Sequence, residues 1–164
     1  TGLSATYYAK PDFQGETTTG LDSQIWFGGK TNVIDKPWPK PEITAKGCSV
    51  VWQGFVQPRF TEPGRLLVYV DIGSQDEKAV PPQRVRLWVN GKLEIDRWDH
   101  RDFLEVHLQT PLLNWAAGSR VPICLEYSCE KPGDELSLCW ESPSQEIQHV
   151  PPGCLYPDTA GSPP

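Results

Sequence analysis

Prolines spread along the whole chain are the feature that most limits what it can fold into. The 164 residues include 17 prolines and 14 glycines, and no stretch keeps an uninterrupted apolar period of 3.6 residues for more than about three turns. Long helices are therefore excluded, and we predict an all-β fold. A chain of this length suits one domain, which can bury about 70% of its unfolded surface without cross-links. We expect that domain to cover residues 1–157 and residues 158–164 to form a disordered tail.

The strongest local signal is a β-hairpin over Arg84–Asp99, with the sequence RVRLWVNGKLEIDRWD. Apolar and polar residues alternate on both sides of Asn90-Gly91, which is the period of a half-buried strand. A two-residue Asn-Gly turn would place Leu87 opposite Glu94 and mix apolar and charged groups on each face. We therefore predict a three-residue loop in which Gly91 takes the left-handed bulge position. This register forms four matched pairs, namely Leu87 with Leu93, Val85 with Ile95, Arg86 with Glu94, and Arg84 with Asp96.

Further strands are predicted wherever alternating runs are bounded by turn residues. A first strand is expected in residues 3–8. Two more hairpins are expected, one joining residues 47–60 to 65–70 and the other joining 121–129 to 135–142. The regular spacing of short strands and turns predicts an antiparallel β-sandwich or barrel.

Charge and hydropathy exclude two classes of partner. The formal net charge is −6 and the pI is near 5.0, and the longest basic cluster has only two or three residues, so we expect no nucleic-acid binding. Apolar runs all fall short of the roughly 18 residues that a membrane-spanning helix needs, so we expect no membrane insertion. The chain has no leading Met or signal-like segment, which we interpret as a processed or excised piece.

Five cysteines leave at least one thiol without an intramolecular partner. Their spacing contains no C-x-x-C pair and no close pair of histidines, so a structural zinc site is not expected. Buried free thiols and one or two disulfide bonds are both compatible with the sequence. The cysteines are Cys48, Cys124, Cys129, Cys139 and Cys154.

Signatures of catalysis are absent from the sequence. It has no nucleophile elbow, zinc-protease motif, phosphate loop or dinucleotide fingerprint. We assign solvent-facing or hydrogen-bonded structural roles to His100, His107 and His149. Neighbouring carboxylates such as Asp134-Glu135 do not by themselves support hydrolysis, because acid and base roles depend on spatial separation. We predict that the chain is not itself an enzyme, although it could be an accessory domain of one.

Two acidic loops between confident strands are the predicted ligand-binding surface. The first covers residues 71–83 and the second residues 130–134, and long loops on rigid strands commonly carry function. Carboxylate and backbone oxygens there could hold calcium, which could orient sugar hydroxyls; a solvated acidic loop or a disordered insertion is the alternative. The predicted ligand-binding side chains in these loops are Asp71, Asp76, Glu77, Lys131 and Asp134.

Two tryptophans are predicted to offer ring faces to a sugar. Trp38 lies among Pro37, Pro39 and Pro41, which favour an extended, polyproline-like loop. An exposed ring in that loop could stack on a sugar, or it could pack over the base of its own loop. Trp98 follows the main hairpin and is the second candidate.

As a set, five segments resemble a PA14 domain, a β-barrel-like sandwich found in glycosidases, glycosyltransferases, fungal adhesins and bacterial binary toxins. The resemblance covers nearly the whole chain and implies a non-catalytic, lectin-like module of a larger secreted or cell-surface protein, most often binding a glycan or polysaccharide and sometimes acting in adhesion. The segments are GLSATYYAKPDFQG, VVWQGFVQP, RLWVNGKLEIDRW, VPICLEYSCEKPGDELSLCWESPSQ and CLYP.

The resemblance also implies a calcium site. In sugar-binding members, two consecutive aspartates end the strand before the main hairpin and bind calcium with help from a later loop. The matching positions here are Asp71 and Ile72, so one of the two ligands is missing. The matching later loop offers Asp134 and the backbone around Lys131, and Asp71 and Asp134 are therefore the predicted metal ligands.

Two functional hypotheses follow. The first is a carbohydrate-binding module of an extracellular or cell-surface protein, with its site between the two acidic loops. The second is an interaction module that packs on a neighbouring domain or a toxin-type partner. This alternative predicts an apolar patch around Trp38 or around Pro111–Trp115.

Overall fold

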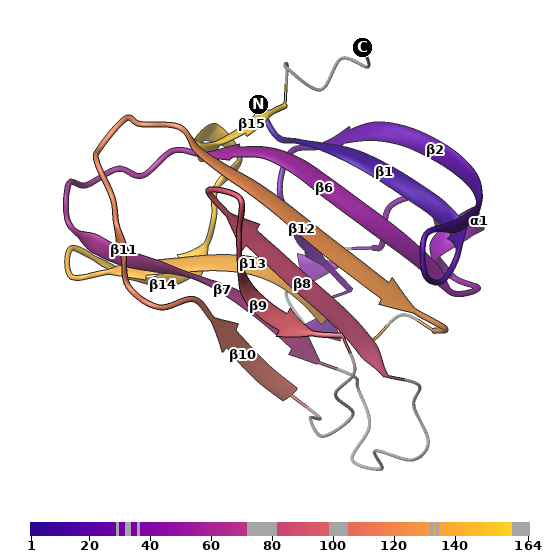
Figure 1. Ribbon diagram of the computed structural model, residues 1–164. Coiled ribbons are helices and arrows are strands. Elements are labelled where there is room, and N and C mark those ends of the chain that lie inside the picture. Colours follow the sequence, from indigo (N-terminus) through magenta and orange to yellow (C-terminus); the bar gives the residue numbers. More distant parts are fainter. Residues whose placement is uncertain are drawn as a thin grey trace.

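The computed structural model describes residues 1–28, 30–31, 34–35, 37–71, 82–98, 105–131, 133 and 135–158. Two large sheets pack face to face as a sandwich (Figure 1), and every strand pairing in the described part is antiparallel. The predicted all-β antiparallel sandwich is confirmed. The domain boundary at residue 157 stays a prediction, and all of the expected tail except Asp158 lies outside the described residues.

The first sheet has the strand order β2-β1-β6-β12-β8-β9, and β15 also pairs with β6. Because β1 and β6 are neighbours although other elements separate them along the chain, the sheet depends on long-range pairing. Its strands are β1 (Leu3–Lys10), β2 (Gln14–Asp22), β6 (Cys48–Val56), β8 (Gln83–Val89), β9 (Lys92–Arg97), β12 (Val121–Cys129) and β15 (Leu155–Pro157).

The second sheet has the order β10-β7-β13-β14, with two short strands, β3 and β11, paired to β13 and β7. Its strands are β3 (Trp26–Phe27), β7 (Pro63–Asp71), β10 (Glu105–Gln109), β11 (Leu113–Asn114), β13 (Glu135–Ser142) and β14 (Gln145–His149). A separate pair is formed by β4 (Lys30–Thr31) and β5 (Ile34–Asp35). The helices of the described part, α1 (Pro41–Thr44) and the 3-10 turn η1 (Pro152–Cys154), are each too short to cross a bilayer.

The core lies between the two sheets and is supplied mainly by alternate residues of the central strands, whereas no residue of β2 is buried. In β8, for example, Val85, Leu87 and Val89 are buried while the residues between them are partly exposed. This alternation is what a strand with one face on a core requires. The largest fully buried side chains include Trp52, Tyr7 and Tyr127 from the first sheet and Trp140, Leu66, Leu136 and Leu138 from the second.

The predicted main hairpin is confirmed as β8–β9, but its predicted register is wrong. Asn90 and Gly91 have φ values of 51° and 76° and form a two-residue turn between Val89 and Lys92. The pairing then shifts by one residue, with Glu94 as the extra residue, so that Leu87 faces Ile95. We predicted that a longer loop would place apolar residues opposite one another. A bulge within β9 does this instead, by bringing Ile95 opposite Leu87.

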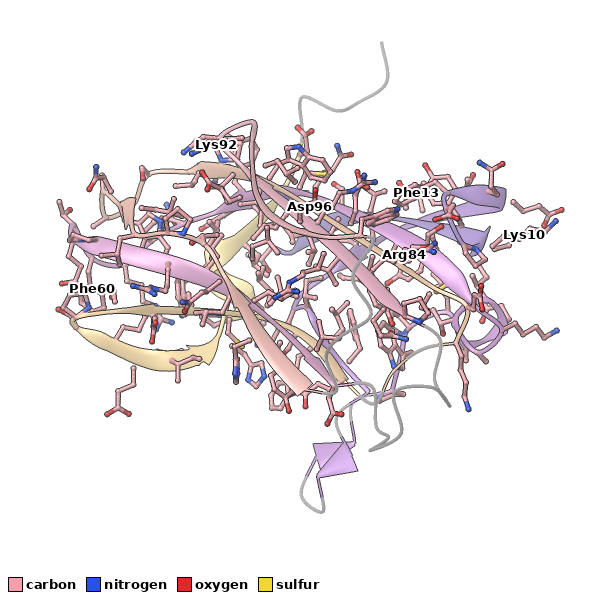
Figure 2. The ribbon with its side chains drawn as sticks, turned by 60° about the horizontal axis from the view of Figure 1, so that its bottom comes forward. Lys10, Phe13, Phe60, Arg84, Lys92 and Asp96 are labelled. Atoms are coloured by element: carbon pink, nitrogen blue, oxygen red, sulfur yellow. The ribbon has the colours of Figure 1, made fainter. Side chains whose placement is uncertain are left out.

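The charged residues of β8 consequently have partners outside the hairpin. Arg86 Nη2 lies 2.8 Å from Glu126 Oε2 on β12, and Arg84 Nη1 lies 3.1 Å from Asp12 Oδ1. Figure 2 shows Arg84 beside the turn that carries Phe13, and Lys92 at the tip of the hairpin. The predicted ion pairs of Arg86 with Glu94 and of Arg84 with Asp96 are therefore wrong. The bulge places Arg86 opposite Asp96, and the two arginines pair with Glu126 and Asp12 instead.

Two other predicted hairpins are wrong for one reason. β6 and β7 lie in different sheets, and so do β12 and β13. Each connection crosses from one layer of the sandwich to the other instead of joining paired strands. Alternation and turn residues are the same in a hairpin and in a crossing of this kind, so local sequence could not separate them.

The proline-bearing segment around Trp38 leads into a short helix, whereas we predicted an extended, polyproline-like loop. Lys40 has a φ of 52°, and the short helix α1 begins directly after it at Pro41. Pro at the first helical position is well tolerated because its missing N–H would have had no intrahelical partner. The Thr44 hydroxyl donates to the Lys40 carbonyl at 3.2 Å, and Thr44 is buried.

One edge of β6 is shared between the two ends of the chain. β1 pairs with its first part and β15 with its last part, and the N–H of Gly2 donates to the Leu155 carbonyl at 2.8 Å. Gly54 lies where the partner changes and has a φ of 152°. A Cβ atom at this position would overlap the Tyr156 carbonyl oxygen, so glycine allows both terminal strands to meet here.

A buried polar contact fixes β2 to the rest of the sheet. Asp22 ends β2, and its Oδ2 atom accepts hydrogen bonds from the Tyr7 hydroxyl and from Trp52 Nε1, the latter at 2.7 Å. Tyr7 and Trp52 are fully buried. Burial and the neighbouring Asp22 raise the pKa of Tyr7, so its hydroxyl remains a donor.

Candidate functional site

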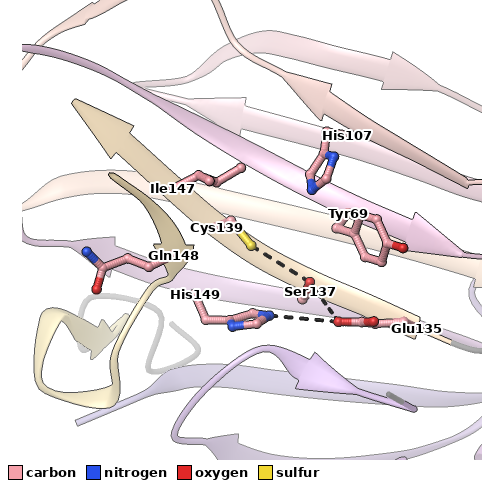
Figure 3. Close-up of a pocket in the computed structure, with 8 residues that line it drawn as sticks. All are labelled: Tyr69, His107, Glu135, Ser137, Cys139, Ile147, Gln148 and His149. Carbon is pink, nitrogen blue, oxygen red and sulfur yellow. Dashed lines mark hydrogen bonds and ion pairs between the residues drawn. The ribbon is translucent and has the colours of Figure 1, made fainter. Parts of the chain in front are cut away.

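A hollow of about 560 Å³ lies on the outer face of the second sheet, and we call it the sheet groove (Figure 3). It combines ring side chains with groups that can donate or accept hydrogen bonds. The side chains come from four neighbouring strands, β7, β10, β13 and β14. They are Tyr69, His107, Glu135, Ser137, Cys139, Ile147, Gln148 and His149.

The groove follows from the period-two alternation of β13. Leu136, Leu138 and Trp140 point into the core, so Glu135, Ser137 and Cys139 point outward. Ser137 and Cys139 are nevertheless almost fully buried, which places them on the floor of the groove. Strand pairing then brings other outward side chains to the same level.

Register aligns a row of ring and hydroxyl groups across three strands. Tyr69 is the partner of both Ser137 on β13 and His107 on β10. The rings of Tyr69 and His107 lie 4.6 Å apart between centroids at an angle of 44°. The groove therefore has an aromatic wall on its β10 side.

A second ring pair is on the opposite side. His149 is the partner of Cys139 on β13, and its ring stacks on Trp26 with centroids 3.7 Å apart and an angle of 12°. His149 Nε2 also lies 3.8 Å from Glu135 Oε1. Stacking and the nearby carboxylate together restrict the orientation of this imidazole.

Glu135 links these groups into a polar chain. Its Oε1 atom accepts a hydrogen bond from the Ser137 hydroxyl at 3.5 Å, and that hydroxyl lies 3.8 Å from the Cys139 sulfur. Figure 3 shows the three side chains in sequence along β13 with His149 beside them. The Glu135 side chain is 18% exposed and that of His149 is 29% exposed, so both can meet a ligand from solvent.

The thiol of Cys139, on the groove floor, is expected to react slowly with alkylating reagents. Burial raises the pKa of Cys139 to about 11 from an ordinary 9.0. We therefore expect iodoacetamide to label Cys139 about 100-fold more slowly than an ordinary thiol at neutral pH, because only the thiolate reacts. Peptide-resolved mass spectrometry measures the rate, and the urea-unfolded chain is the control. Equal labelling rates before and after unfolding would contradict this prediction.

The predicted loop site lies at one end of this sheet. Asp71 is the last residue of β7 and the register partner of Glu135. Gln83, at the start of β8, donates from Nε2 to the Lys131 carbonyl at 2.8 Å and accepts from the Gly133 N–H at 3.1 Å. The described ends of the two acidic loops thus lie close together, as the first hypothesis required. Their role in ligand binding stays a prediction.

The other predicted loop residues cannot be placed. Asp76, Glu77 and Asp134 lie outside the described residues. Among the residues that are described, no group of three or more His, Cys, Asp or Glu side chains could hold a metal ion. Calcium binding through Asp71 and Asp134 stays a prediction.

Neither predicted tryptophan lines the groove. Trp38 stacks on Tyr127 of β12 with centroids 5.4 Å apart and packs against the core. Trp98 stacks on Phe13 at 5.6 Å, and the Arg86 guanidinium carbon lies 3.8 Å from its ring centroid. Both rings are already engaged within the protein, and a role in sugar binding stays a prediction.

The apolar patch predicted by the interaction hypothesis is partly exposed, since Pro111, Leu112 and Asn114 are exposed. Trp115 is 5% exposed and belongs to the core, whereas Leu112 is 59% exposed. Trp38 is partly buried against the core. The two tryptophans therefore pack inward, while Leu112 and its neighbours remain at the surface, and the interaction hypothesis stays a prediction.

Sequence reasoning missed the groove residues altogether. His107 and His149 were assigned structural roles, and Tyr69, Glu135 and Cys139 were assigned no ligand-binding role. A signal was present in ELSLCW, where a polar residue alternates with each apolar one. What the sequence lacked was the order of strands, which brings Tyr69 next to Ser137.

No protein-family model matches the chain. Several matches at about 30% identity are named as anti-sigma factors. The anti-sigma-I factor RsgI3 of Acetivibrio thermocellus is 31% identical over 160 residues, which is 95% of this chain and 21% of that protein. A solved anti-sigma factor domain-containing protein is 30% identical, with a TM-score of 0.73 over 95% of this chain and 48% of that one. The chain thus spans about a fifth of the curated relative and about half of the solved one.

A more distant match concerns the architecture. The PA14 sugar-binding domain from an RTX adhesin superposes with a TM-score of 0.58, covering 94% of this chain and 97% of that one at 11% identity. The fold is PA14-like. At this level of identity the likeness shows the PA14-like fold alone and carries no function with it.

The predicted function is wrong in its main statement. We expected a carbohydrate-binding module of a secreted or cell-surface protein, but the matches at 30–31% identity are named as anti-sigma factors. The error arose because the function was carried over from the PA14 resemblance, and one fold hosts many functions. These matches are also named as regulators rather than as enzymes.

Proposed function

We propose that this chain is a non-catalytic sensory domain of a larger regulator of the anti-sigma-factor type, and that it responds to a saccharide bound in the sheet groove. The regulatory role is supported by 31% identity to RsgI3 over 95% of the chain. Because the matched region is only 21% of that protein, the remaining length of such a regulator would contact the sigma factor.

The proposal of a saccharide ligand is based on the side chains that line the groove. Tyr69, His107 and His149 offer ring edges and faces that can pack against the C–H faces of a sugar. Glu135 and Gln148 offer hydrogen-bonding groups for hydroxyls at the same surface. A hollow of about 560 Å³ is within the range of sites that take ligands of a few hundred daltons. A short stretch of a polysaccharide has this mixture of apolar faces and hydroxyls.

The proposed location follows from the ligand. Polysaccharides are met outside the cell, so we place the domain on the outer side of the cytoplasmic membrane as part of its parent protein. Neighbouring domains of that protein are its other proposed partners.

Binding tests the ligand class directly. Affinity electrophoresis against soluble neutral and acidic polysaccharides, followed by calorimetry on the best one, measures Kd for the purified chain. We expect Glu135→Gln to weaken binding about 10-fold, because it replaces a charged acceptor by a neutral amide of the same size. Glu141→Gln is the matched control, since Glu141 lies on the same strand outside the groove beside Arg65.

The sensory role needs a second measurement. In cells that carry the intact parent protein, a reporter gene read by its sigma factor should respond to the best polysaccharide with the wild-type chain and with Glu141→Gln. Glu135→Gln should require about 10 times more polysaccharide for the same response. If no polysaccharide binds, or if Glu135→Gln binds as tightly as wild type, the proposed ligand site is wrong. Tight binding without any reporter response would reject the sensory role alone.

A further inference from the structure

Cys48 and Cys129 face each other across two neighbouring strands, and we propose that they form a disulfide bond in the mature protein. Cys48 is the first residue of β6, Cys129 is the last residue of β12, and the two are register partners. Both belong to the core and are 0% and 2% exposed. They are free thiols in this structure.

Strand geometry already satisfies the requirements of the bond. Directly opposed residues in an antiparallel pair have Cα atoms about 4.5–5.5 Å apart, and disulfide bonds need about 4.4–6.8 Å. The two thiols also interact in the reduced state. This interaction, followed by burial, raises the pKa of Cys48, and it lowers the pKa of Cys129. The register therefore places the two residues in the range of Cα separations that a disulfide bond requires.

The other three cysteines are placed elsewhere, so the pairing is specific. Cys124 lies on the opposite face of β12, because it is an odd number of residues from Cys129. Cys139 lies on the floor of the sheet groove in the other sheet. Cys154 lies beside Gln57, beyond the far end of β6 from Cys48.

Bond formation balances as a thiol–disulfide exchange with an external disulfide such as oxidised glutathione. The Cys129 thiolate attacks one sulfur of the oxidant and releases one glutathione thiolate. The Cys48 thiol loses its proton, attacks the mixed disulfide and releases the second. Two cysteine thiols lose two electrons and two protons, and the oxidant becomes two thiols. Because both sulfur atoms are buried in the folded chain, we expect the reaction to occur during folding.

The proposed disulfide bond would lie directly beside the predicted loop at residues 130–134. At the next position, a Cβ on Gly47 would overlap the Glu130 carbonyl oxygen, so the two segments already touch there. Cross-linking Cys48 to Cys129 would therefore hold the start of this loop, which leads into Glu135 of the groove. The inference does not depend on which ligand the groove receives.

Refolding in a mixture of oxidised and reduced glutathione tests the proposal. After alkylation in denaturant, intact-mass spectrometry should count three modified cysteines, rising to five after reduction. An unreduced peptide digest should link the peptides of Cys48 and Cys129. Because the bond would close a long loop, reduction should lower Tm by roughly 10 °C.

Single variants separate this bond from a disulfide between any other two cysteines. In Cys48→Ala, oxidised and reduced samples should have the same Tm, whereas Cys124→Ala should keep the full difference. Five modifiable cysteines in the wild-type chain after oxidative refolding would overturn the proposal, and so would a peptide link between any other pair. The mass measurement on wild type decides the outcome even if a variant does not fold.

Discussion

Gly54→Ala is expected to lower the free energy of unfolding by about 4 kcal/mol, which is a large part of the roughly 5–15 kcal/mol of a typical domain. The new Cβ would overlap the Tyr156 carbonyl oxygen and lie 2.9 Å from Leu3 Cδ2. The alanine would also have to adopt a φ of 152°, which costs about 1–3 kcal/mol. Relief requires β15 to move away from β6, and the steric part adds about 1–3 kcal/mol. Urea unfolding followed by tryptophan fluorescence measures the change.

Gly91→Ala is the matched control for this prediction. Gly91 also has a positive φ, of 76°, but nothing lies within 4 Å of an added Cβ. Its substitution should cost only the conformational penalty of about 1 kcal/mol. If Gly54→Ala proves no more destabilising than Gly91→Ala, the close approach of β15 to β6 is wrong.

Asp22→Ala is expected to cost a similar amount, about 4 kcal/mol. The substitution removes the acceptor of two buried donors, the Tyr7 hydroxyl and Trp52 Nε1. Each buried donor left without an acceptor costs about 1–3 kcal/mol. The pH of the measurement should matter little for Tyr7, because burial and Asp22 raise its pKa and the hydroxyl stays protonated. Chemical unfolding at pH 7 measures the effect.

A double-mutant cycle isolates the origin of that loss. Tyr7→Phe removes one of the two donors, so Asp22→Ala should be less costly in that background by about 1 kcal/mol or more. Asp22→Asn keeps an oxygen that can accept from Trp52 and should be milder than Asp22→Ala. Additive losses in the cycle would show that the Tyr7–Asp22 contact contributes nothing.

The site illustrates which functional residues local patterns can reveal. Acidic loops between strong strands are visible in the sequence, and the described ends of the two predicted loops do lie together. The ligand-binding roles of Asp71 and Lys131 stay predictions. The sheet groove was missed because its residues come one at a time from the outward faces of different strands. An outward Ser or His on a strand is ordinary surface until its neighbours are known.

Function was the least accessible property. The resemblance of five segments to PA14 domains predicted the fold, and the PA14-like fold is confirmed by distant structural likeness. The solved anti-sigma factor domain-containing protein has a similar architecture and a different named role. Sequence patterns that specify strands and turns determine which residues are buried. Proteins of one fold share that pattern whatever their function, so the pattern does not identify the function.

The sequence by itself determined that this chain forms short antiparallel strands with one apolar face. The reason is that alternation, prolines and turn residues act within a few residues, and they were enough to predict β1 and the β8–β9 hairpin. Only the tertiary structure decided which strands share a sheet, where β9 bulges, and that Tyr69, Glu135 and His149 meet in one groove. These outcomes depend on contacts between segments that are distant in the sequence. Such contacts form and contribute to stability only when the two sheets pack together, so local patterns do not reveal them.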